Sequence, residues 1–462
     1  MAGHRVRAYH RPLTPRVADL RSRIGSWPSA ALLNRPGGQS ILAAHPRLIL
    51  ESAPSRAATP GSGRPDPDLD PLLQLDGLIR RHGLDGANDG LDPDLPFQGG
   101  LIGFLSYDLA PFIEAVPRRL PAGSSMPILR FGLYDTFVLV DQDRAELWAV
   151  DLLDEGEQAV RARLDRWSDL LHQPSPEAGE RAELGPVTPD QTPGEFRARV
   201  EQARRYIAAG DIFQVNLSQR FATTSSRFAP LPLDTRLQAA SPATYAAYLR
   251  WDEFAILSAS PELFYETRGR AIITQPIKGT RPRSADSRRD EAMVAELLAS
   301  PKEQAELTMI VDLERNDLGR VCEFGSVRVA DPRSVMSISH LHHTVATVVG
   351  RLRADAGPIE VVRAMFPGGS ITGAPKIRAM EIIDELEPCR RGVYTGSIGY
   401  WSANGRSAFN IAIRTVVAEG NRISYHVGGG IVAESDPEQE YQETLAKGRA
   451  LFATLSRPGD ES

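Results

Sequence analysis

Three strand-like segments follow one another near the C-terminal end of the sequence, with no helical pattern between them. They cover residues 397–401, 408–417 and 422–426 and are rich in aromatic and β-branched residues. Further strand-like segments lie at 99–107, 131–141, 215–221 and 255–258, and helical patterns lie at 157–171, 194–209, 301–313, 360–365, 375–385 and 437–455. Because strands and helices are mixed without a regular βαβ rhythm, the sequence predicts an α+β fold with largely antiparallel sheets.

Composition and charge restrict the class of protein. The chain has 462 residues, 42% hydrophobic and 24% charged, which is typical of a globular enzyme with two lobes or one large composite domain. A net charge of −6 argues against nucleic acid as a partner. The sequence has no apolar run long enough to predict a membrane span, and residues 1–12 do not look like a signal peptide. With only Cys322 and Cys389 and hence no disulfide scaffold, we expect a cytoplasmic enzyme.

Two segments interrupt the ordered patterns. Residues 52–70 are rich in proline, alanine, glycine and serine and predict a surface loop. Residues 172–193 carry several prolines among charged residues and predict a linker. The sequence therefore divides into an N-terminal part (1–171), a linker (172–193) and a C-terminal part (194–462).

Two pairs of glutamates have the spacing of one helical face. Glu440, Glu443 and Lys447 are related as i, i+3 and i+7, and Glu303 and Glu306 as i and i+3. Carboxylates from two helices can meet across a site and bind a hard cation such as Mg²⁺. That ion takes one or two protein carboxylates and leaves its other positions to water and an anionic substrate. On spacing alone, solvated helix faces explain these residues better.

Lys278 lies in the segment TQPIKGTRPR (274–283), where a strand would enter a turn. A lysine amine is a nucleophile only when it is neutral, so its pKa must be lowered by burial or by a nearby cation. Upstream, Glu262 follows a Ser-Pro pair, and its carboxyl group can act as a general acid if its pKa is raised. A surface lysine in a turn and an exposed glutamate near a proline are the ordinary alternatives.

Glycine, arginine and histidine supply further candidates. The segments FPGGSITGAPK (366–376) and GGG (428–430) match neither a P-loop nor a dinucleotide fingerprint, but their backbone N–H groups can approach an anion closely. Arg414 lies in an apolar β-type run, where a carboxylate is its natural partner. In HLHH (340–343) the last two histidines would point to opposite faces of a strand with no cysteine near. This pattern argues against zinc and for a histidine that lines a polar pocket.

Taken together, these segments resemble the chorismate-utilising family, which includes component I of anthranilate synthase and of aminodeoxychorismate synthase and, more distantly, isochorismate and salicylate synthases. The matching segments follow in order within 194–457 and read ELTMIVDLERNDLGRVC, FPGGSITGAPKIRAMEIIDELEP, GVYTGSIGY, IAIRT, GGGIV and EYQETLAKGRAL. Residues 1–171 match more loosely, at PFQGGLIGFLSYDL and FGLYDTFVLVD. The resemblance implies two antiparallel sheets packed around a core with helices outside. It also implies that 194–462 is the chorismate-binding catalytic domain, while 1–171 adds strands to the same body.

Lys278 is the position at which the resemblance separates two products. Aminodeoxychorismate synthases carry Pro-Ile-Lys-Gly-Thr here, as this chain does at 276–280, whereas anthranilate synthases have alanine in place of the lysine. By resemblance, Lys278 attacks C2 of chorismate, Glu262 is the general acid for departure of the C4 hydroxyl, and ammonia then adds at C4. The implied product is 4-amino-4-deoxychorismate, the precursor of p-aminobenzoate in folate biosynthesis. Anthranilate synthase, isochorismate or salicylate synthase, and an idle subunit that binds chorismate or tryptophan are the alternatives.

The resemblance also implies a metal site and a substrate pocket. Glu306 and Glu443 match Mg²⁺ ligands, with Glu303 and Glu440 one helical turn away as supporting carboxylates. For the substrate, Arg414 and Tyr394 match the residues that hold the enolpyruvyl carboxylate. We expect the backbone N–H groups of Gly428, Gly429 and Gly430 to bind the ring carboxylate. We expect His343, Thr372 and Lys447 to line the pocket.

Differences from the family pattern concern the helix at 303–307 and the partners. Residues 303–307 read EQAEL where relatives often read DRAEN, but the position of Glu306 is kept. Residues 48–52 (LILES) resemble the tryptophan-binding element of anthranilate synthases, so tryptophan is a possible ligand of the N-terminal part. Neither cysteine lies in a nucleophile context typical of a glutamine amidotransferase. We therefore expect this chain to use ammonia that a separate amidotransferase subunit releases from glutamine.

Overall fold

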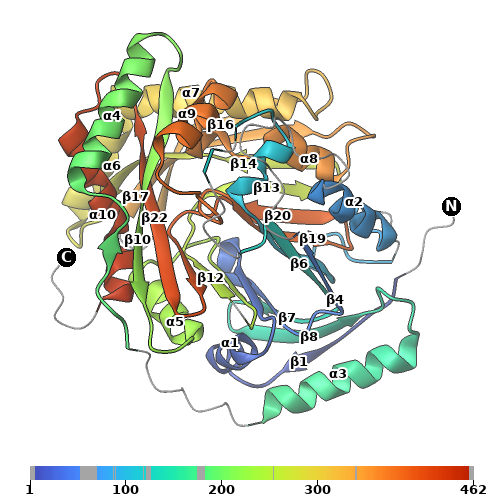
Figure 1. The fold of residues 1–462 in the computed structure, drawn as a ribbon. Coiled ribbons are helices and arrows are strands. Elements are labelled where there is room, and N and C mark those ends of the chain that lie inside the picture. The colour runs from blue at the N-terminus through green and yellow to red at the C-terminus, as the bar shows by residue number, and fades with distance from the viewer. Residues whose placement is uncertain are drawn as a thin grey trace.

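The computed structural model describes residues 6–52, 70–86, 88, 90–117, 119–120, 126–173, 183–252, 254–338 and 341–456. Most of the predicted loop at 52–70, part of the predicted linker at 172–193 and residue 340 lie outside the described residues. The described chain forms two large antiparallel sheets with helices around them (Figure 1). The predicted α+β class with two antiparallel sheets is therefore confirmed.

The first sheet has twelve strands in the described part of the chain. Its order is β1-β8-β7-β3-β2-β11-β12-β21-β22-β10-β18, and β9 pairs with β10. Its strands are β1 (Ala8–Leu13), β2 (Ala31–Asn34), β3 (Gln39–Ala43), β7 (Thr136–Asp141), β8 (Arg144–Val150), β9 (Thr188–Pro189), β10 (Gln214–Thr224), β11 (Ala247–Arg250), β12 (Phe254–Ser258), β18 (Gly373–Ala374), β21 (Thr415–Glu419) and β22 (Arg422–Ile431).

The second sheet has ten strands in the described part of the chain, in the order β15-β17-β14-β13-β20-β19-β5-β6-β4, with β16 paired to β17. Its strands are β4 (Leu48–Ser52), β5 (Gly100–Leu105), β6 (Leu129–Tyr134), β13 (Leu263–Arg268), β14 (Ala271–Gln275), β15 (Ile277–Pro282), β16 (Arg328–Ile338), β17 (Leu341–Arg351), β19 (Ser397–Ser402) and β20 (Arg406–Asn410).

The helices lie outside the sheets. They are α1 (Val17–Ser26), α2 (Pro71–Arg81), α3 (Glu157–His172), α4 (Pro193–Ala208), α5 (Pro230–Ala240), α6 (Ser287–Ala299), α7 (Pro301–Gly319), α8 (Pro358–Met365), α9 (Lys376–Leu386) and α10 (Pro437–Leu455), with short 3₁₀ turns η1 (Pro36–Gly38), η3 (Tyr107–Phe112) and η4 (Gly369–Ile371). Helices α4 and α10 lie side by side against the part of the first sheet that contains β10 and β22 (Figure 1). No helix within the described ranges is long and apolar enough to cross a membrane.

Two predicted strands are each divided between the sheets. The prediction of one strand at 131–141 is wrong, because β6 and β7 belong to different sheets with only Asp135 between them. The prediction of one strand at 408–417 is wrong for the same reason, since β20 and β21 lie in different sheets. Each segment is mostly apolar, and single polar residues such as Asp135 and Arg414 near the change of sheet were too few to divide the predicted strands.

Strands from both ends of the sequence pair with each other. In the first sheet Leu32 of β2 pairs with Tyr248 of β11, and in the second sheet Ile102 of β5 pairs with Tyr400 of β19. The boundaries 1–171, 172–193 and 194–462 stay a prediction, and these ladders cross them. The N-terminal residues thus complete both sheets that carry the C-terminal part.

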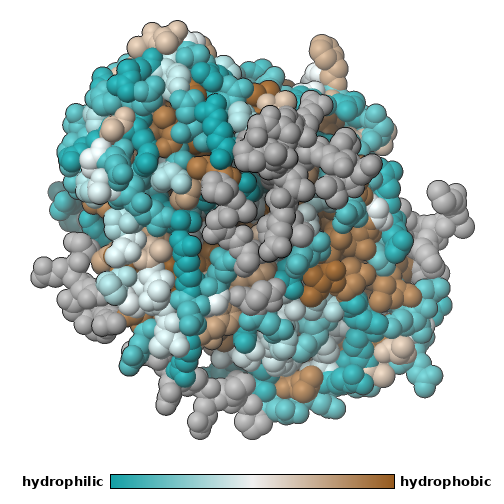
Figure 2. Space-filling view, viewed as in Figure 1, coloured by the Kyte–Doolittle hydropathy of each residue, from teal (hydrophilic) through white to brown (hydrophobic). Residues whose placement is uncertain are grey.

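The core lies between the two sheets. One buried cluster contains Phe104 and Tyr400 from the second sheet and Ile256 from the first, each at most 1% exposed. Burying such apolar surface contributes roughly 25 cal/mol per Å². The face drawn in Figure 2 is largely hydrophilic, with hydrophobic residues gathered over the region of β4 and β6 and in smaller areas elsewhere. Strand β4, which holds the predicted tryptophan element, is the edge strand there and exposes Ile49.

Candidate active site

Lys278 lies on β15, next to a β-bulge. Gly279 has φ +70°, and the pairing of β15 with β17 shifts register immediately after the pair between Lys278 and Thr344. A positive φ is easily adopted by glycine, so the bulge follows from the local sequence. The amine of Lys278 donates a hydrogen bond of 3.2 Å to the carbonyl oxygen of Ser370. The sequence predicted a strand end at Lys278, but the structure has a bulge inside β15 here. From this bulge the lysine side chain reaches the loop that carries Ser370.

Glu262 lies beside this lysine. It is 4% exposed, and its Oε1 accepts a long hydrogen bond of 3.4 Å from the backbone N–H of Ile277. Burial raises the pKa of Glu262, and the hydroxyl of Ser370 and the charge of Lys278 oppose that shift only in part. Burial also lowers the pKa of Lys278 against the opposing charges of Glu262 and Glu306. The two shifts together favour a neutral amine next to a protonated acid.

Helices α7 and α10 carry the two predicted carboxylate pairs. The hydroxyl of Ser300 accepts a hydrogen bond of 3.3 Å from the N–H of Glu303 at the start of α7. The carboxylate of Asp436 accepts one of 2.9 Å from the N–H of Gln439 at the start of α10. Each helix also has proline in its first turn. These caps fix where the helices begin and therefore which glutamates face the site.

The glutamates of the two helices interact across the site. Burial raises the pKa of Glu306, and the negative charges of Glu303 and Glu443 raise it further. Glu440 is 6% exposed and its carboxylate accepts a hydrogen bond of 2.6 Å from the hydroxyl of Ser435. The pKa of Glu443 is instead lowered, chiefly by Lys447. Its negative charge raises the pKa of Glu306 and Glu440, and a cation between these carboxylates would relieve that repulsion.

A cation has two available carboxylates here rather than four. Glu303 faces Arg281 at 3.5 Å, and Glu443 forms an ion pair of 2.6 Å with Lys447. Within the described ranges, no group of three or more histidine, cysteine, aspartate or glutamate side chains is arranged to hold a metal ion. The two that remain, Glu306 and Glu440, come one from each helix, and two such carboxylates suit Mg²⁺, because this ion takes most of its ligands from water and substrate. The predicted ligand Glu443 could bind the ion only by releasing Lys447. The metal site stays a prediction on this geometry.

The three glycines at 428–430 lie inside β22 and not in a turn. They pair with Ser218, Leu217 and Asn216 of β10. A Cβ atom at Gly429 would lie 3.2 Å from Oε2 of Glu440, and the amine of Lys447 donates a hydrogen bond of 3.3 Å to the carbonyl oxygen of Gly428. The glycine strand therefore lies directly against the acidic face of α10, with no side chain between them.

Tyr394 and Arg414 form another side of the site. Tyr394 is 7% exposed and stacks on His426 at 5.1 Å, and its hydroxyl lies 2.9 Å from where a Cβ atom of Gly428 would be. Arg414 has φ +49° in the connection between β20 and β21, and its carbonyl oxygen accepts from the N–H of Ala259. Burial lowers the pKa of Arg414, and its guanidinium contacts no carboxylate among the described residues. It is a partly buried cation that has no carboxylate partner among the described residues.

The two histidines of β17 have different environments, as the strand prediction requires. His343 is 2% exposed, and its Nδ1 lies 3.3 Å from the carbonyl oxygen of Gly279. Because a carbonyl can only accept, this contact favours the proton on Nδ1 and leaves Nε2 as an acceptor with no partner in the described structure. Burial, helped by Arg414, lowers the pKa of His343 to about 4. His342 instead lies 2.9 Å from Asp290.

Thr372 lies in the loop between α8 and α9. It is fully buried, and its hydroxyl donates a hydrogen bond of 3.0 Å to the carbonyl oxygen of Gly368. The side-chain amide of Asn216 donates a hydrogen bond of 3.1 Å to the carbonyl oxygen of Ser370, the same atom that accepts from Lys278. Sequence reasoning missed Asn216 and Ser370. The only signal was a polar residue in a strand and a serine in a glycine-rich segment.

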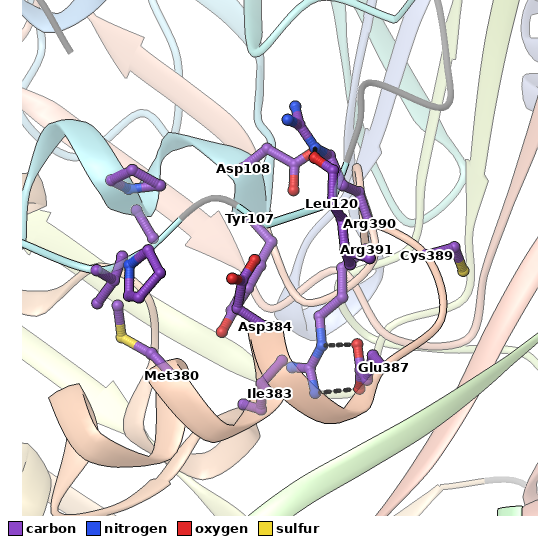
Figure 3. Close-up of a pocket in the computed structure, with 14 residues that line it drawn as sticks. Tyr107, Asp108, Leu120, Met380, Ile383, Asp384, Glu387, Cys389, Arg390 and Arg391 are labelled. Carbon is purple, nitrogen blue, oxygen red and sulfur yellow. Dashed lines mark hydrogen bonds and ion pairs between the residues drawn. The ribbon is translucent and has the colours of Figure 1, made fainter. Parts of the chain in front are cut away.

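A separate cavity of about 50 Å³ lies between η3 and α9 (Figure 3). Its described lining residues are Tyr107, Asp108, Ala110, Pro111, Val116, Pro117, Leu120, Met380, Ile383, Asp384, Glu387, Cys389, Arg390 and Arg391. None of the residues predicted for the site is among them. The guanidinium of Arg391 and the carboxylate of Glu387 form two parallel hydrogen bonds on one side of this cavity (Figure 3).

A comparison with protein families gives one match over most of the chain. A family described as chorismate binding enzyme matches residues 42–453. The chain belongs to the chorismate-binding enzyme family. The resemblance inferred from the sequence is confirmed, and the glutamates, glycines and lysine described above all lie within the matched range.

Similar proteins of the chorismate-binding family carry two names. The chain is 40% identical over 372 residues to aminodeoxychorismate synthase component 1 of Bacillus subtilis (strain 168), which covers 79% of each chain. It is 42% identical over 375 residues to an anthranilate synthase component 1 of Haloarcula marismortui, which covers 78% of this chain and 76% of that one. The crystal structure of anthranilate synthase component I from Streptococcus pneumoniae TIGR4 has a TM-score of 0.79 at 32% identity and covers 90% of this chain and 92% of that one. The chain is a chorismate-utilising enzyme of the aminodeoxychorismate or anthranilate synthase type.

Proposed function

We propose that this enzyme is component I of an aminodeoxychorismate synthase, which converts chorismate and ammonia to 4-amino-4-deoxychorismate and water. The observation that supports this proposal is Lys278, a buried amine that shares Ser370 with the buried acid Glu262. A nucleophile at C2 of chorismate directs the incoming nitrogen to C4. Without such a nucleophile, ammonia adds at C2 and the product is that of an anthranilate synthase.

In the first step the neutral amine of Lys278 attacks C2 of chorismate. Both ring double bonds shift, from C1=C2 and C5=C6 to C1=C6 and C4=C5, the bond between C4 and its oxygen breaks, and Glu262 gives the proton with which the hydroxyl leaves as water. Burial lowers the pKa of Lys278 and raises that of Glu262, so both groups are held in the protonation state that this step requires. The resulting carboxylate of Glu262 can take the proton that the attached nitrogen loses.

In the second step ammonia attacks C4. Both ring double bonds shift back, and the bond between C2 and the lysine nitrogen breaks. Lys278 is released as an amine, which takes the proton that the added nitrogen loses. The sum of both steps replaces the C4 hydroxyl with an amino group and retains the enolpyruvyl group.

The pocket walls suit the two carboxylates of chorismate. Arg414 is a partly buried guanidinium without a carboxylate partner in the described structure, and with the hydroxyl of the buried Tyr394 it would bind the enolpyruvyl carboxylate. Backbone N–H groups of Gly428, Gly429 and Gly430 would bind the ring carboxylate. The remaining pocket residues in this proposal are His343, Thr372 and Lys447.

Glu306 and Glu443 would hold Mg²⁺ beside the ring carboxylate, with Glu303 and Glu440 behind them. Bound there, the ion would supply the positive charge that neutralises the substrate carboxylate and fixes the ring. The relatives named component 1 support a second subunit as partner, and we propose a glutamine amidotransferase that supplies the ammonia. We further propose a cytoplasmic role in folate biosynthesis, with β4 as the element to test for tryptophan binding.

Product analysis tests this assignment. Purified enzyme is incubated with chorismate, Mg²⁺ and ammonium, and products are separated before and after addition of an aminodeoxychorismate lyase. We expect a product that yields p-aminobenzoate only after the lyase is added. Lys278→Ala should abolish that product, whereas Arg144→Ala, which removes an exposed basic side chain on β8 of the other sheet, should keep it.

Anthranilate synthase is the second candidate, because relatives with that name are as similar in sequence. Direct formation of anthranilate and pyruvate by the unmodified enzyme would establish this candidate and refute the first. A shift from aminodeoxychorismate toward anthranilate in Lys278→Ala would instead support attack by Lys278 at C2.

A further inference from the structure

Glu387 and Arg391 form a buried ion pair behind the active-site loop. Their side chains are 3% and 2% exposed, and two hydrogen bonds of 2.7 and 2.9 Å join them (Figure 3). Each partner also binds the surrounding backbone. Glu387 accepts hydrogen bonds of 2.8 Å from both the N–H and the hydroxyl of Ser218, which pairs with Gly428 of the glycine strand.

Arg391 contacts the active-site loop and strand β10. It donates a hydrogen bond of 3.0 Å to the carbonyl oxygen of Ile371, the residue before Thr372. It donates another of 2.6 Å to the carbonyl oxygen of Asn216. Its guanidinium also lies 5.8 Å from the centre of the Tyr394 ring. One buried cation thus touches the loop of Thr372, Tyr394 and strand β10, and the first two of these carry predicted substrate contacts.

Asn216 connects this ion pair to the lysine. Its backbone carbonyl accepts from Arg391, while its side-chain amide donates to the carbonyl oxygen of Ser370. That oxygen is also the acceptor for the amine of Lys278. A continuous series of hydrogen bonds therefore runs from Glu387 through Arg391, Asn216 and Ser370 to Lys278.

We propose that Asn216 and the ion pair Glu387–Arg391 are positioning residues for the amine of Lys278. They hold the carbonyl oxygen of Ser370 at the place where it orients the lysine beside Glu262. This inference rests on the proposed function, in which Lys278 is the nucleophile. The series gives a role to a fully buried ion pair, since its contacts with Ile371 and Asn216 hold the side of the loop that carries Ser370.

The test uses Asn216→Ala, because this change leaves the ion pair and the backbone of Asn216 in place. The rate at which acetic anhydride modifies Lys278 is measured by mass spectrometry without substrate, and kcat and KM for chorismate are measured separately. We expect Lys278 modification to become several-fold faster. Without the amide of Asn216, the carbonyl oxygen of Ser370 is no longer held where it accepts from the amine. The kcat should fall about tenfold, the loss expected for one hydrogen bond, while KM changes less than about twofold.

The matched control is Glu266→Gln, which disrupts a different, partly buried set of ion pairs. In that set Glu266 lies 2.9 Å from Arg35 and 2.8 Å from Arg406. It should lower the unfolding temperature without changing the modification of Lys278. The variant Arg391→Lys should reproduce the Asn216→Ala result if it folds.

The readouts separate failure of this inference from failure of the proposed function. Unchanged modification and kcat in Asn216→Ala, or an equal change in Glu266→Gln, would overturn the positioning role. If modification and kcat change as expected but the product is anthranilate, the positioning role stands and the proposed product is refuted.

Discussion

Two pairs of side chains, each made of one basic and one acidic residue, lie close together in the interior of this enzyme. They differ in how completely their hydrogen-bonding groups are satisfied. Arg391 and Glu387 satisfy each other twice and bind several backbone groups besides. Among the described residues, the partly buried Lys278 has one acceptor at 3.2 Å, and Glu262 accepts one backbone bond of 3.4 Å besides its contact with the hydroxyl of Ser370. The first pair has the donors and acceptors that a buried charge requires, whereas the second lacks them.

The pKa shifts follow this difference. Burial opposes the charge of Arg391, but Glu387 and Tyr107 outweigh it and raise the pKa of that guanidinium. At Lys278 and Glu262 burial dominates, and both groups shift toward their neutral forms. A buried pair can therefore serve as a rigid support when its hydrogen bonds are complete, or as reactive groups when they are not.

The largest expected effect is on stability, at the support pair. Arg391→Ala should lower the free energy of unfolding by about 3–5 kcal/mol, because it leaves the carboxylate of Glu387 buried without a cation. Urea unfolding at pH 7.5 measures this. The double variant Glu387→Gln/Arg391→Met should recover part of the loss. A decrease below about 1 kcal/mol would mean that the two pairs do not differ as argued.

The next effect is on catalysis at the reactive pair. Glu262→Gln should lower kcat by roughly 10²–10⁴, because the amide cannot donate the proton that the C4 hydroxyl needs. The unfolding temperature should change little. Steady-state rates with saturating chorismate and ammonium measure the effect, and a rate near that of the unmodified enzyme would exclude Glu262 as the acid.

A third buried carboxyl group, that of Glu314, extends the comparison to the pH dependence of the free energy of unfolding. Burial, together with Asp317, raises the pKa of Glu314 to about 8 in the folded protein, well above its unfolded value of about 4.3. Between these values the folded state binds the extra proton, so the free energy of unfolding should fall as pH rises toward 8. Urea unfolding from pH 5.5 to 8.5 should show a decrease on the order of 2 kcal/mol that is smaller in Glu314→Gln. An equal decrease in both proteins would assign it to other groups.

The smallest expected effect is on stability at the reactive pair. Lys278→Met should change the free energy of unfolding by less than about 1 kcal/mol, or increase it, because an incompletely satisfied buried amine is replaced by an apolar chain of similar length. Thermal and urea unfolding of the inactive variant measure this. A loss as large as that of Arg391→Ala would show that Lys278 also supports the fold.

Local sequence patterns predicted the site helices well. Helix α10 spans Pro437–Leu455, close to the predicted range, and α7 begins at Pro301 as expected. Both begin at a capping residue followed by proline, a signal that can be read within a few residues. The spacing of Glu303 and Glu306 therefore translated directly into a shared helical face.

The supporting contacts could not be predicted in this way. Asn216 and Arg391 are 175 positions apart, and their hydrogen bond has no periodic pattern in the sequence. The same holds for the change of sheet at Asp135, where the residues on both sides are equally apolar. Contacts that depend on the path of the chain through both sheets become visible only in the folded structure.

The pairing of N-terminal and C-terminal strands limits how this protein can be divided. A fragment of residues 194–462 would lack β2 and β5, so β11 and β19 would each lose a neighbouring strand. Two interior strands would then become open edges that can pair with other molecules, a known route to aggregation. The proposed catalytic residues all lie in that fragment, yet we expect that the fragment does not behave as an independent enzyme. Expression studies and engineered fusions should therefore keep both ends of the sequence in one polypeptide.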